Sequence, residues 1–445
     1  MPEIASSPAS TLTPAKTARQ RTDTFTSIWM IIAVAMALVT LVVKNRMPQP
    51  LWTMIHLVTL GVLSNGIFQW SWFFARSLAR LSADDPRARR HNTIRILIFN
   101  ACFLLLFVSM WLGWMVGTMI AATGIAAVAA WHGAEMLSVL RERLASRFVI
   151  VVRYYVCSAS FFVLAALLAS FVSATMFSPS IPEAMVAMRD RLTLAHALSG
   201  VAGWVGLTIG GTVITLGPTI LRTRMSPDAV SGGVRVLLPW CLSLLLAIAG
   251  ALLGVMPLVG AGILAVGTCA IVGIVYPYAK VLRNKGPREY SAWSFLLGLL
   301  WISVGVCALG VASLFVSTPS QLRALTLMWL PIIGIAGFAQ LFQGALSYLM
   351  PVVIGGGPSV VRIGIAIIDW QYSLRLGLRN SALILELFLF FTSESSSVQV
   401  LRTAGWLLVI ATFVIDVVIY AKTGVTQAQA RRARSETLSE SRQVQ

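Results

Sequence analysis

The chain has 445 residues, of which 57% are hydrophobic and only 11% charged, with a formal net charge of +18. An average soluble protein has roughly 25% charged residues, so this composition excludes a set of water-soluble domains. One membrane-spanning helix needs about 20 apolar residues, and the apolar content is sufficient for about twelve such helices. The sequence therefore predicts an all-α, polytopic membrane protein.

Taken in chain order, residues 1–24 are polar and are interpreted as a cytoplasmic tail. A membrane domain is expected over 25–422, and a polar cytoplasmic tail at 423–445 is expected to be disordered. Each of twelve apolar segments is expected to cross the bilayer once. They lie near 25–43, 51–75, 95–113, 115–138, 148–172, 193–217, 234–254, 256–280, 292–316, 324–352, 380–393 and 399–421.

Basic residues gather in every second connection, which is the pattern of cytoplasmic loops and not of a nucleic-acid-binding surface. With twelve spans, both termini are then expected in the cytoplasm, in the inner membrane of a bacterium. The basic connections and the second tail include Arg87, Arg89, His91, Arg141, Arg143, Arg222, Arg283, Arg375, Arg379, Arg431 and Arg432. We expect His91 to be solvated. The connection 354–379 opens with three glycines and mixes apolar with polar residues, so it predicts an interfacial helix.

Two histidines, His56 and His196, lie near the outer ends of the second and sixth segments. Both segments run inward, so both imidazoles are expected one to two turns below the outer surface. Matched depth is what a shared copper or haem site requires. The alternative is two separate interface histidines, each bonded to backbone or water.

Four further ionisable residues stand inside apolar segments, where charge is costly. His132 and Glu135 are three residues apart on the fourth segment and can share a metal or pass protons. Alternatively they form an anchoring network beside Arg141 and Arg143. Glu386 and Asp416 lie on consecutive antiparallel segments. They are expected side by side as a proton-handling pair or, alternatively, in ion pairs with Arg379, Lys422 or Arg153.

Four stretches of sequence suggest a family. They are HLVTLGVLSNGIFQWSWFFARSL from His56, AHALSGVAGWVGLTIGGTVITLGPTILRTRM from Ala195, FQGALSYLMPVVIGGGPSVVRIG from Phe342, and RYYVCSAS from Arg153. Together they resemble the membrane region of actinobacterial multicopper oxidases and copper nitrite reductases. A wider similarity is to the catalytic subunit of haem–copper oxidases and to nitric-oxide-response membrane proteins.

The resemblance implies copper or haem binding at His56 and His196. The family usually has further histidines where this chain has Leu198 and Phe73, and an Asn in place of Gly200. Without these residues a complete binuclear centre is not expected, and the chain is not expected to be an enzyme by itself. The expected role is to support an extracytoplasmic copper or nitrogen-oxide redox system, with a cupredoxin or multicopper oxidase as partner. The alternatives are a proton-coupled secondary transporter and a ligand-free membrane scaffold.

Overall fold

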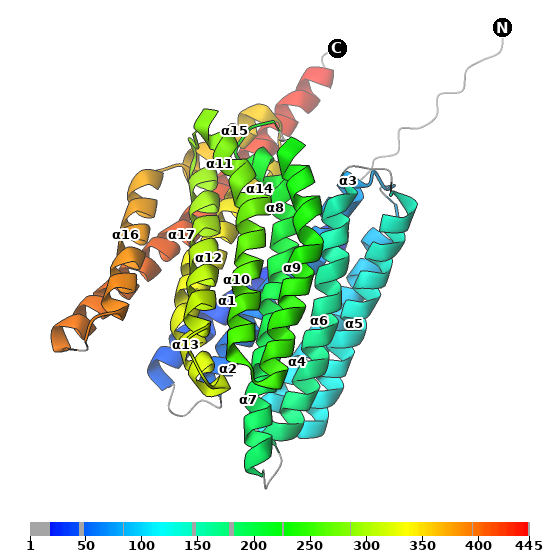
Figure 1. The fold of residues 1–445 in the computed structure, drawn as a ribbon. Coiled ribbons are helices and arrows are strands. Elements are labelled where there is room, and N and C mark those ends of the chain that lie inside the picture. The colour runs from blue at the N-terminus through cyan, green and yellow to red at the C-terminus, as the bar shows by residue number, and fades with distance from the viewer. Residues whose placement is uncertain are drawn as a thin grey trace. The chain divides into compact units, whose positions relative to one another are not determined.

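The computed structural model describes residues 18–43, 49–82, 84–144, 148–177, 182–224, 227–284, 286–393 and 395–443. These residues form helices joined by short connections, and no strand occurs among them (Figure 1). In this part of the chain, ten helices are long and apolar enough to cross a membrane. The all-α, multi-pass membrane class predicted from composition is therefore confirmed, and a lipid bilayer is its environment.

The helices divide into two compact units, residues 1–212 and 213–445. Unit 1 contains α1 (Ala18–Val43), α2 (Pro50–His56), α3 (Asn65–Leu78), α4 (Asn92–Leu112), α5 (Met115–Glu142), α6 (Val149–Met176), α7 (Glu183–Ala197) and the start of α8 (Leu207–Ile220). Three π-helical segments belong to the same unit: η1 (Leu57–Ser64), η2 (Arg87–His91) and η3 (Leu198–Gly206).

The core of unit 1 is aromatic. Phe68, Phe99 and Phe162 are buried, and Phe162 stacks on Trp204 with ring centres 4.6 Å apart. Offset and edge-on contacts of this kind stabilise packing beyond the area that they bury. The cluster joins α3, α4, α6 and η3. Since α3 continues the span of α2, and η3 continues that of α7, the cluster fixes the two spans that carry the histidines.

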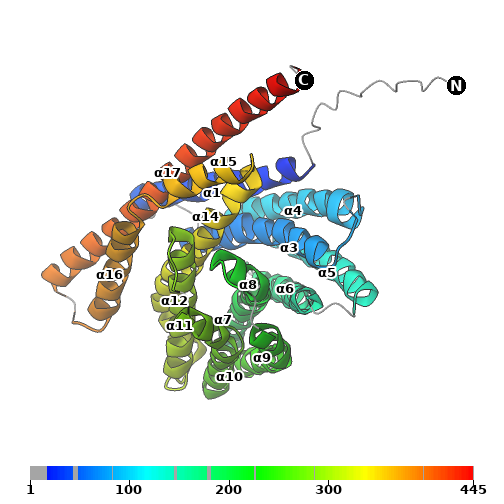
Figure 2. The ribbon, with the colours of Figure 1, turned by 90° about the horizontal axis from the view of Figure 1, so that it is seen from above.

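Unit 2 contains the rest of α8, then α9 (Pro227–Leu253), α10 (Met256–Ala270), α11 (Tyr276–Asn284), α12 (Tyr290–Ser313), α13 (Pro319–Pro331), α14 (Gln340–Ile354), α15 (Pro358–Ile368), α16 (Tyr372–Phe390) and α17 (Ser396–Gln443). The π-helical segments η4 (Ile271–Val275) and η5 (Ile332–Ala339) lie between these helices. The short helix α15 lies alongside the long helix α17 (Figure 2).

Small residues allow α12 and α14 to approach each other closely. A Cβ atom at Gly298 would collide with the backbone of Leu341, and one at Gly344 would collide with the backbone of Phe295. Glycine at both sides of a crossing is typical of helix pairs in membranes, where close contact replaces the hydrophobic driving force.

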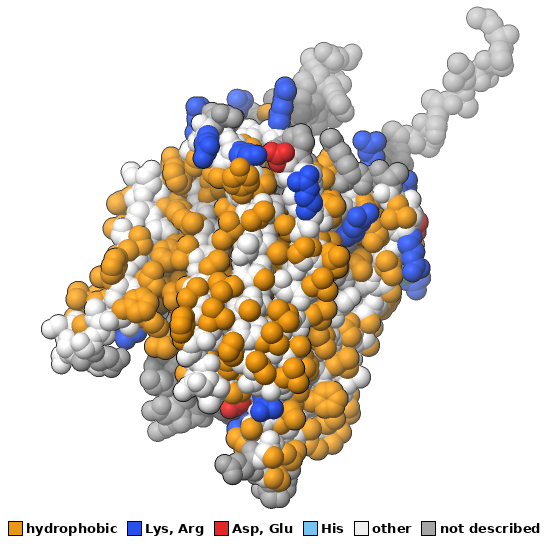
Figure 3. Space-filling model, viewed as in Figure 1, with side chains coloured by type: hydrophobic (Ala, Val, Ile, Leu, Met, Phe, Trp, Pro, Cys, Tyr) orange, Lys and Arg blue, Asp and Glu red, His pale blue; other side chains and the backbone are white. Residues whose placement is uncertain are grey.

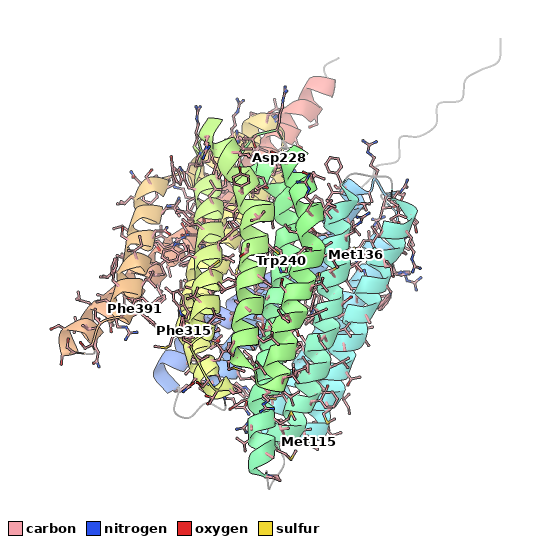
Figure 4. All side chains as sticks on the ribbon, viewed as in Figure 1. Met115, Met136, Asp228, Trp240, Phe315 and Phe391 are labelled. Atoms are coloured by element: carbon pink, nitrogen blue, oxygen red, sulfur yellow. The ribbon has the colours of Figure 1, made fainter. Side chains whose placement is uncertain are left out.

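The two ends of unit 2 differ in charge. Basic side chains crowd the end that carries Asp228 (Figure 4), which is paired with Lys280, while apolar side chains cover most of the helix surface below them (Figure 3). Phe315, 82% exposed, lies at the opposite end from Asp228 (Figure 4). A band of apolar surface with a basic end is the distribution expected of a protein that spans a bilayer.

Several expected boundaries differ from the structure. A short helix, α15, lies within 354–379, where an interfacial helix is expected, but α16 already begins at Tyr372, eight residues before the expected eleventh segment. The expected disordered tail from 423 is wrong in the described residues, because α17 continues as helix to Gln443. Of the expected tail 1–24, residues 18–24 belong to α1 and residues 1–17 lie outside the described part.

Candidate functional site

The helix geometry changes directly after both candidate histidines. His56 ends α2 and is followed by the π-helical segment η1, and His196 stands two residues before the π-helical segment η3. The indole Nε1–H of Trp204 in η3 donates to the Ser64 hydroxyl in η1 at 2.9 Å. Wide π turns inside membrane helices often accompany functional sites because they redirect side chains.

The structure brings the two histidines together. The ring centres of His56 and His196 lie 6.1 Å apart and their planes differ by only 14°. Both side chains are half-buried. The matched depth expected from the sequence is thus accompanied by an actual approach of the two imidazoles within unit 1.

Each imidazole is held by a backbone carbonyl. The Nδ1–H of His56 donates to the Trp52 carbonyl at 2.9 Å, and that of His196 donates to the Ala165 carbonyl at 2.8 Å. A carbonyl oxygen can only accept, so these bonds select the tautomer with a free lone pair on Nε2. Neither Nε2 has a hydrogen-bond partner among the described residues. Metal-ligating histidines in proteins show this same arrangement, with the second nitrogen donating to a carbonyl or carboxylate.

Aromatic packing fixes the orientation of His56. Trp52 stacks on its ring with centres 4.3 Å apart, and the neighbouring Thr53 accepts a hydrogen bond from Trp111 Nε1 at 3.0 Å. The second contact ties α2 to α4. The imidazole is therefore held by stacking on one face and by a hydrogen bond at Nδ1.

Among the His, Cys, Asp and Glu side chains of the described residues, the two imidazoles have no third ligand beside them. No group of three or more His, Cys, Asp or Glu side chains in that part of the chain can hold a metal ion. A structural zinc site takes four protein ligands, whereas haem iron needs only axial ligands because the porphyrin supplies the others. A metal bound about 2.0–2.1 Å from a nitrogen on each side separates two facing imidazole centres by about 6 Å. The observed spacing between the ring centres, 6.1 Å with near-parallel planes, matches that separation.

The second candidate pair in unit 1 is divided between two networks. His132 is fully buried, with Nε2 3.3 Å from the Ser71 hydroxyl, and its Nδ1 has no partner in the described structure. Glu135 instead binds Arg95, His91 at 2.7 Å and the Trp131 Nε1–H at 2.9 Å. The expectation that His132 and Glu135 act together is not met.

Arg95 was missed in the sequence, and His91 was misjudged. Arg95 is fully buried against Glu135 and lies over the rings of Trp72 and Trp131. His91 is paired with Glu135 and is not simply solvated. The anchoring network expected near this end of α5 exists, but Arg95 and His91 form it and not Arg141 and Arg143. The signal that could have found this network was Arg95 itself, a lone arginine at the start of an otherwise apolar segment.

A buried charge cluster lies in unit 2. Arg375 and Arg379 of α16 both bind the Asp416 carboxylate of α17, and all three are at most 3% exposed. Tyr290 donates its hydroxyl to Asp416 at 2.6 Å, and Arg379 donates to Gln343 at 2.9 Å. The two arginines counted as loop charges in the sequence are therefore interior residues. The ion pair of Asp416 with Arg379 is the alternative that the sequence left open.

Glu386 and Asp416 do not lie side by side. Glu386, 5% exposed, packs against Gly405, where a Cβ atom would collide with its Oε1. Gly405 precedes Asp416 on α17 by 11 residues, which is about 16 Å along a helix. The expected carboxylate pair is therefore two separate sites.

Outside the bilayer segments, burial affects one further carboxylate. Asp369, in the turn between α15 and α16, accepts a hydrogen bond from the Tyr290 backbone N–H at 2.8 Å. Its burial raises the pKa of the carboxyl above the usual range. Asp369 thus fixes the turn from which the two buried arginines enter the structure.

No protein-family model matches the chain, and no curated protein matches it. The functional argument therefore rests on the site itself.

Proposed function

We propose that this chain is a membrane haem protein that holds a haem between His56 and His196 and relays electrons to or from an extracytoplasmic copper or nitrogen-oxide redox partner. One observation carries the proposal: two near-parallel imidazoles 6.1 Å apart, each with Nδ1 bonded to a backbone carbonyl. Copper at the same two nitrogens is the competing ligand.

The ligand set favours electron transfer over catalysis. When bound, a haem supplies a one-electron couple whose potential depends on its axial ligands and on burial. His56 and His196 would both hold the haem iron through Nε2, so the two side chains would serve binding and electron transfer rather than substrate activation. The carbonyls of Trp52 and Ala165 hold the ring orientation, and Trp52 shields one face of His56 from solvent.

The proposal includes twelve spans with both termini in the cytoplasm, in the cytoplasmic membrane. The ten long apolar helices support it, together with α1 and α16 as the first and eleventh spans. The positive-inside rule then orients the basic connections inward and the ends of the segments with His56 and His196 outward. A soluble cupredoxin or multicopper oxidase is the expected docking partner at that outer face.

The test is a visible spectrum and metal analysis of the purified protein and of two variants, His56→Ala and His196→Ala. We expect a Soret band in the unmodified protein and loss of most haem in either variant, because each removes one of the two imidazoles that would hold the haem. His91→Gln, which changes a histidine bound to Glu135, is the matched control and should retain haem. Copper without haem would reassign the ligand, and unchanged content in both alanine variants would exclude the site.

A further inference from the structure

A basic hollow opens at the end of unit 2, where α14 ends against α17. Its volume is about 450 Å³, and it is lined by Ile354, Ala428, Arg431, Arg432, Ser435 and Glu436. The residues of α17 that form it belong to the stretch from 423 that the sequence marks as a tail. The hollow shares no residue with the histidine pair or with the buried cluster around Asp416.

The arginines around this hollow retain hydrogen-bonding capacity. Arg431 uses one N–H to bind the Ile354 carbonyl at 2.8 Å, out of the five that a guanidinium carries. Arg432 is exposed and has no partner among the described residues. One turn away, Arg434 binds the Gly356 carbonyl at 2.9 Å and the Ser359 hydroxyl at 2.7 Å. Glu436 is the only acid in the lining, so the local charge is positive.

Apolar surface adjoins these charges. Ile354 forms part of the hollow, and the preceding Val352 and Val353 are 49% and 47% exposed on the same turn of α14. Guanidinium groups bind phosphate through paired N–H donors, and exposed valines bind acyl chains. A ligand that satisfies both surfaces is amphipathic and anionic.

We propose that Arg431 and Arg432 bind the phosphate of an anionic phospholipid whose acyl chains lie along the exposed valines of α14. Basic pockets beside membrane helices bind lipid headgroups through the same combination of charge and depth. The proposal is independent of the haem site, since it rests on unit 2 alone.

The experiment uses the full chain in detergent. Phosphatidylglycerol, phosphatidylcholine and inorganic phosphate are each titrated, and binding is followed by the rise in the midpoint of thermal unfolding. Phosphatidylglycerol should stabilise the unmodified protein, and phosphatidylcholine should have little effect. Arg432→Gln should weaken the apparent affinity for phosphatidylglycerol about fivefold, the effect expected of one basic residue at a membrane surface. Arg323→Gln, an exposed arginine on α13 at the other end of unit 2, removes the same charge and should leave affinity unchanged.

Arg432→Gln is the decisive variant because Arg432 supports no other contact of the described structure, so its loss does not disturb folding. Arg431→Gln also removes the bond to Ile354 and serves as a second, stronger variant. Equal stabilisation by phosphatidylcholine, or equal affinity in Arg432→Gln and Arg323→Gln, would overturn the lipid site. Stabilisation by inorganic phosphate alone, with no added effect of the lipid, would also overturn it and assign a soluble phosphate instead.

Discussion

Trp204 donates its indole N–H to the hydroxyl of Ser64, and this bond connects the two π-helical segments that follow His196 and His56. Both residues are buried, so the bond forms away from water. It links the second and sixth apolar segments at a fixed level below the histidines. The spacing of the imidazoles is therefore a property of the helix crossing and not of two flexible side chains.

The first prediction concerns that bond. Ser64→Ala leaves the buried Trp204 Nε1–H without an acceptor, which costs about 1–3 kcal/mol. We expect a lower midpoint of thermal unfolding and weaker haem retention, because the two spans that carry the histidines lose a hydrogen bond that connects them. The control is Ser160→Ala, whose exposed hydroxyl bonds only the Val156 carbonyl within its own helix. Equal haem retention in the two variants would show that the bond does not position the histidines.

The second prediction concerns the buried charges of unit 2. Asp416→Asn keeps the size of the side chain but leaves Arg375 and Arg379 without a counter-charge. Breaking a buried pair in this way costs about 3–5 kcal/mol, and thermal unfolding in detergent should report it. Asp228→Asn is the control, because its pair with Lys280 is about half exposed on both sides, and solvent-exposed ion pairs contribute little to stability. Similar losses in the two variants would contradict the assigned burial.

The third prediction concerns Arg95 and Glu135 in unit 1. Glu135→Gln should destabilise the protein by about 3–5 kcal/mol, because it leaves the buried guanidinium uncompensated. Arg95→Met combined with Glu135→Leu should recover most of that loss, since apolar residues can replace a buried pair at little cost. Unfolding midpoints of the single and double variants measure the coupling. A double variant less stable than Glu135→Gln would show that the pair is needed for more than charge balance.

The fourth prediction concerns the contact between α12 and α14. Gly344→Ala places a Cβ atom against the backbone of Phe295 and should destabilise by about 1–3 kcal/mol, the usual cost of overpacking. Gly377→Ala in α16 meets nothing within 4 Å and should stabilise slightly, because alanine favours helix by about 0.5–1 kcal/mol. Opposite signs of the two shifts in unfolding midpoint are the expected result.

The fifth prediction concerns the number of spans. Reporter fusions at positions 85, 228 and 286 should report cytoplasm, and a fusion at position 320 should report the outside. The informative position is 394, between α16 and α17. If α16 crosses the bilayer, a fusion there reports outside, and a cytoplasmic signal would remove α16 and reduce the count.

The helical class was predictable from composition. The common depth of His56 and His196 was predicted by counting residues from the segment ends, because the rise per residue of a helix is constant. It could not predict η1 or η3, since a π turn depends on the packing of neighbours such as Trp204. Arg375 and Arg379 were misjudged because an arginine near a segment end resembles a loop charge. Their counter-charge, Asp416, is 37 positions beyond Arg379 in the sequence, so the sequence does not reveal the pairing. Contacts of that range are set by tertiary packing.

The three glycines between α14 and α15 all adopt positive φ angles, 72°, 97° and 84° for Gly355, Gly356 and Gly357. Side chains of α17 bind the backbone carbonyls around this bend. Gln427 donates to the carbonyls of Pro351 and Gly355. Arg431 donates to the carbonyl of Ile354, and Arg434 to that of Gly356. All three donors belong to the stretch from 423 that the composition predicts to be a disordered tail. A chain shortened before Gln427 would lack these side-chain hydrogen bonds. The bend at the three glycines would then have no support from α17.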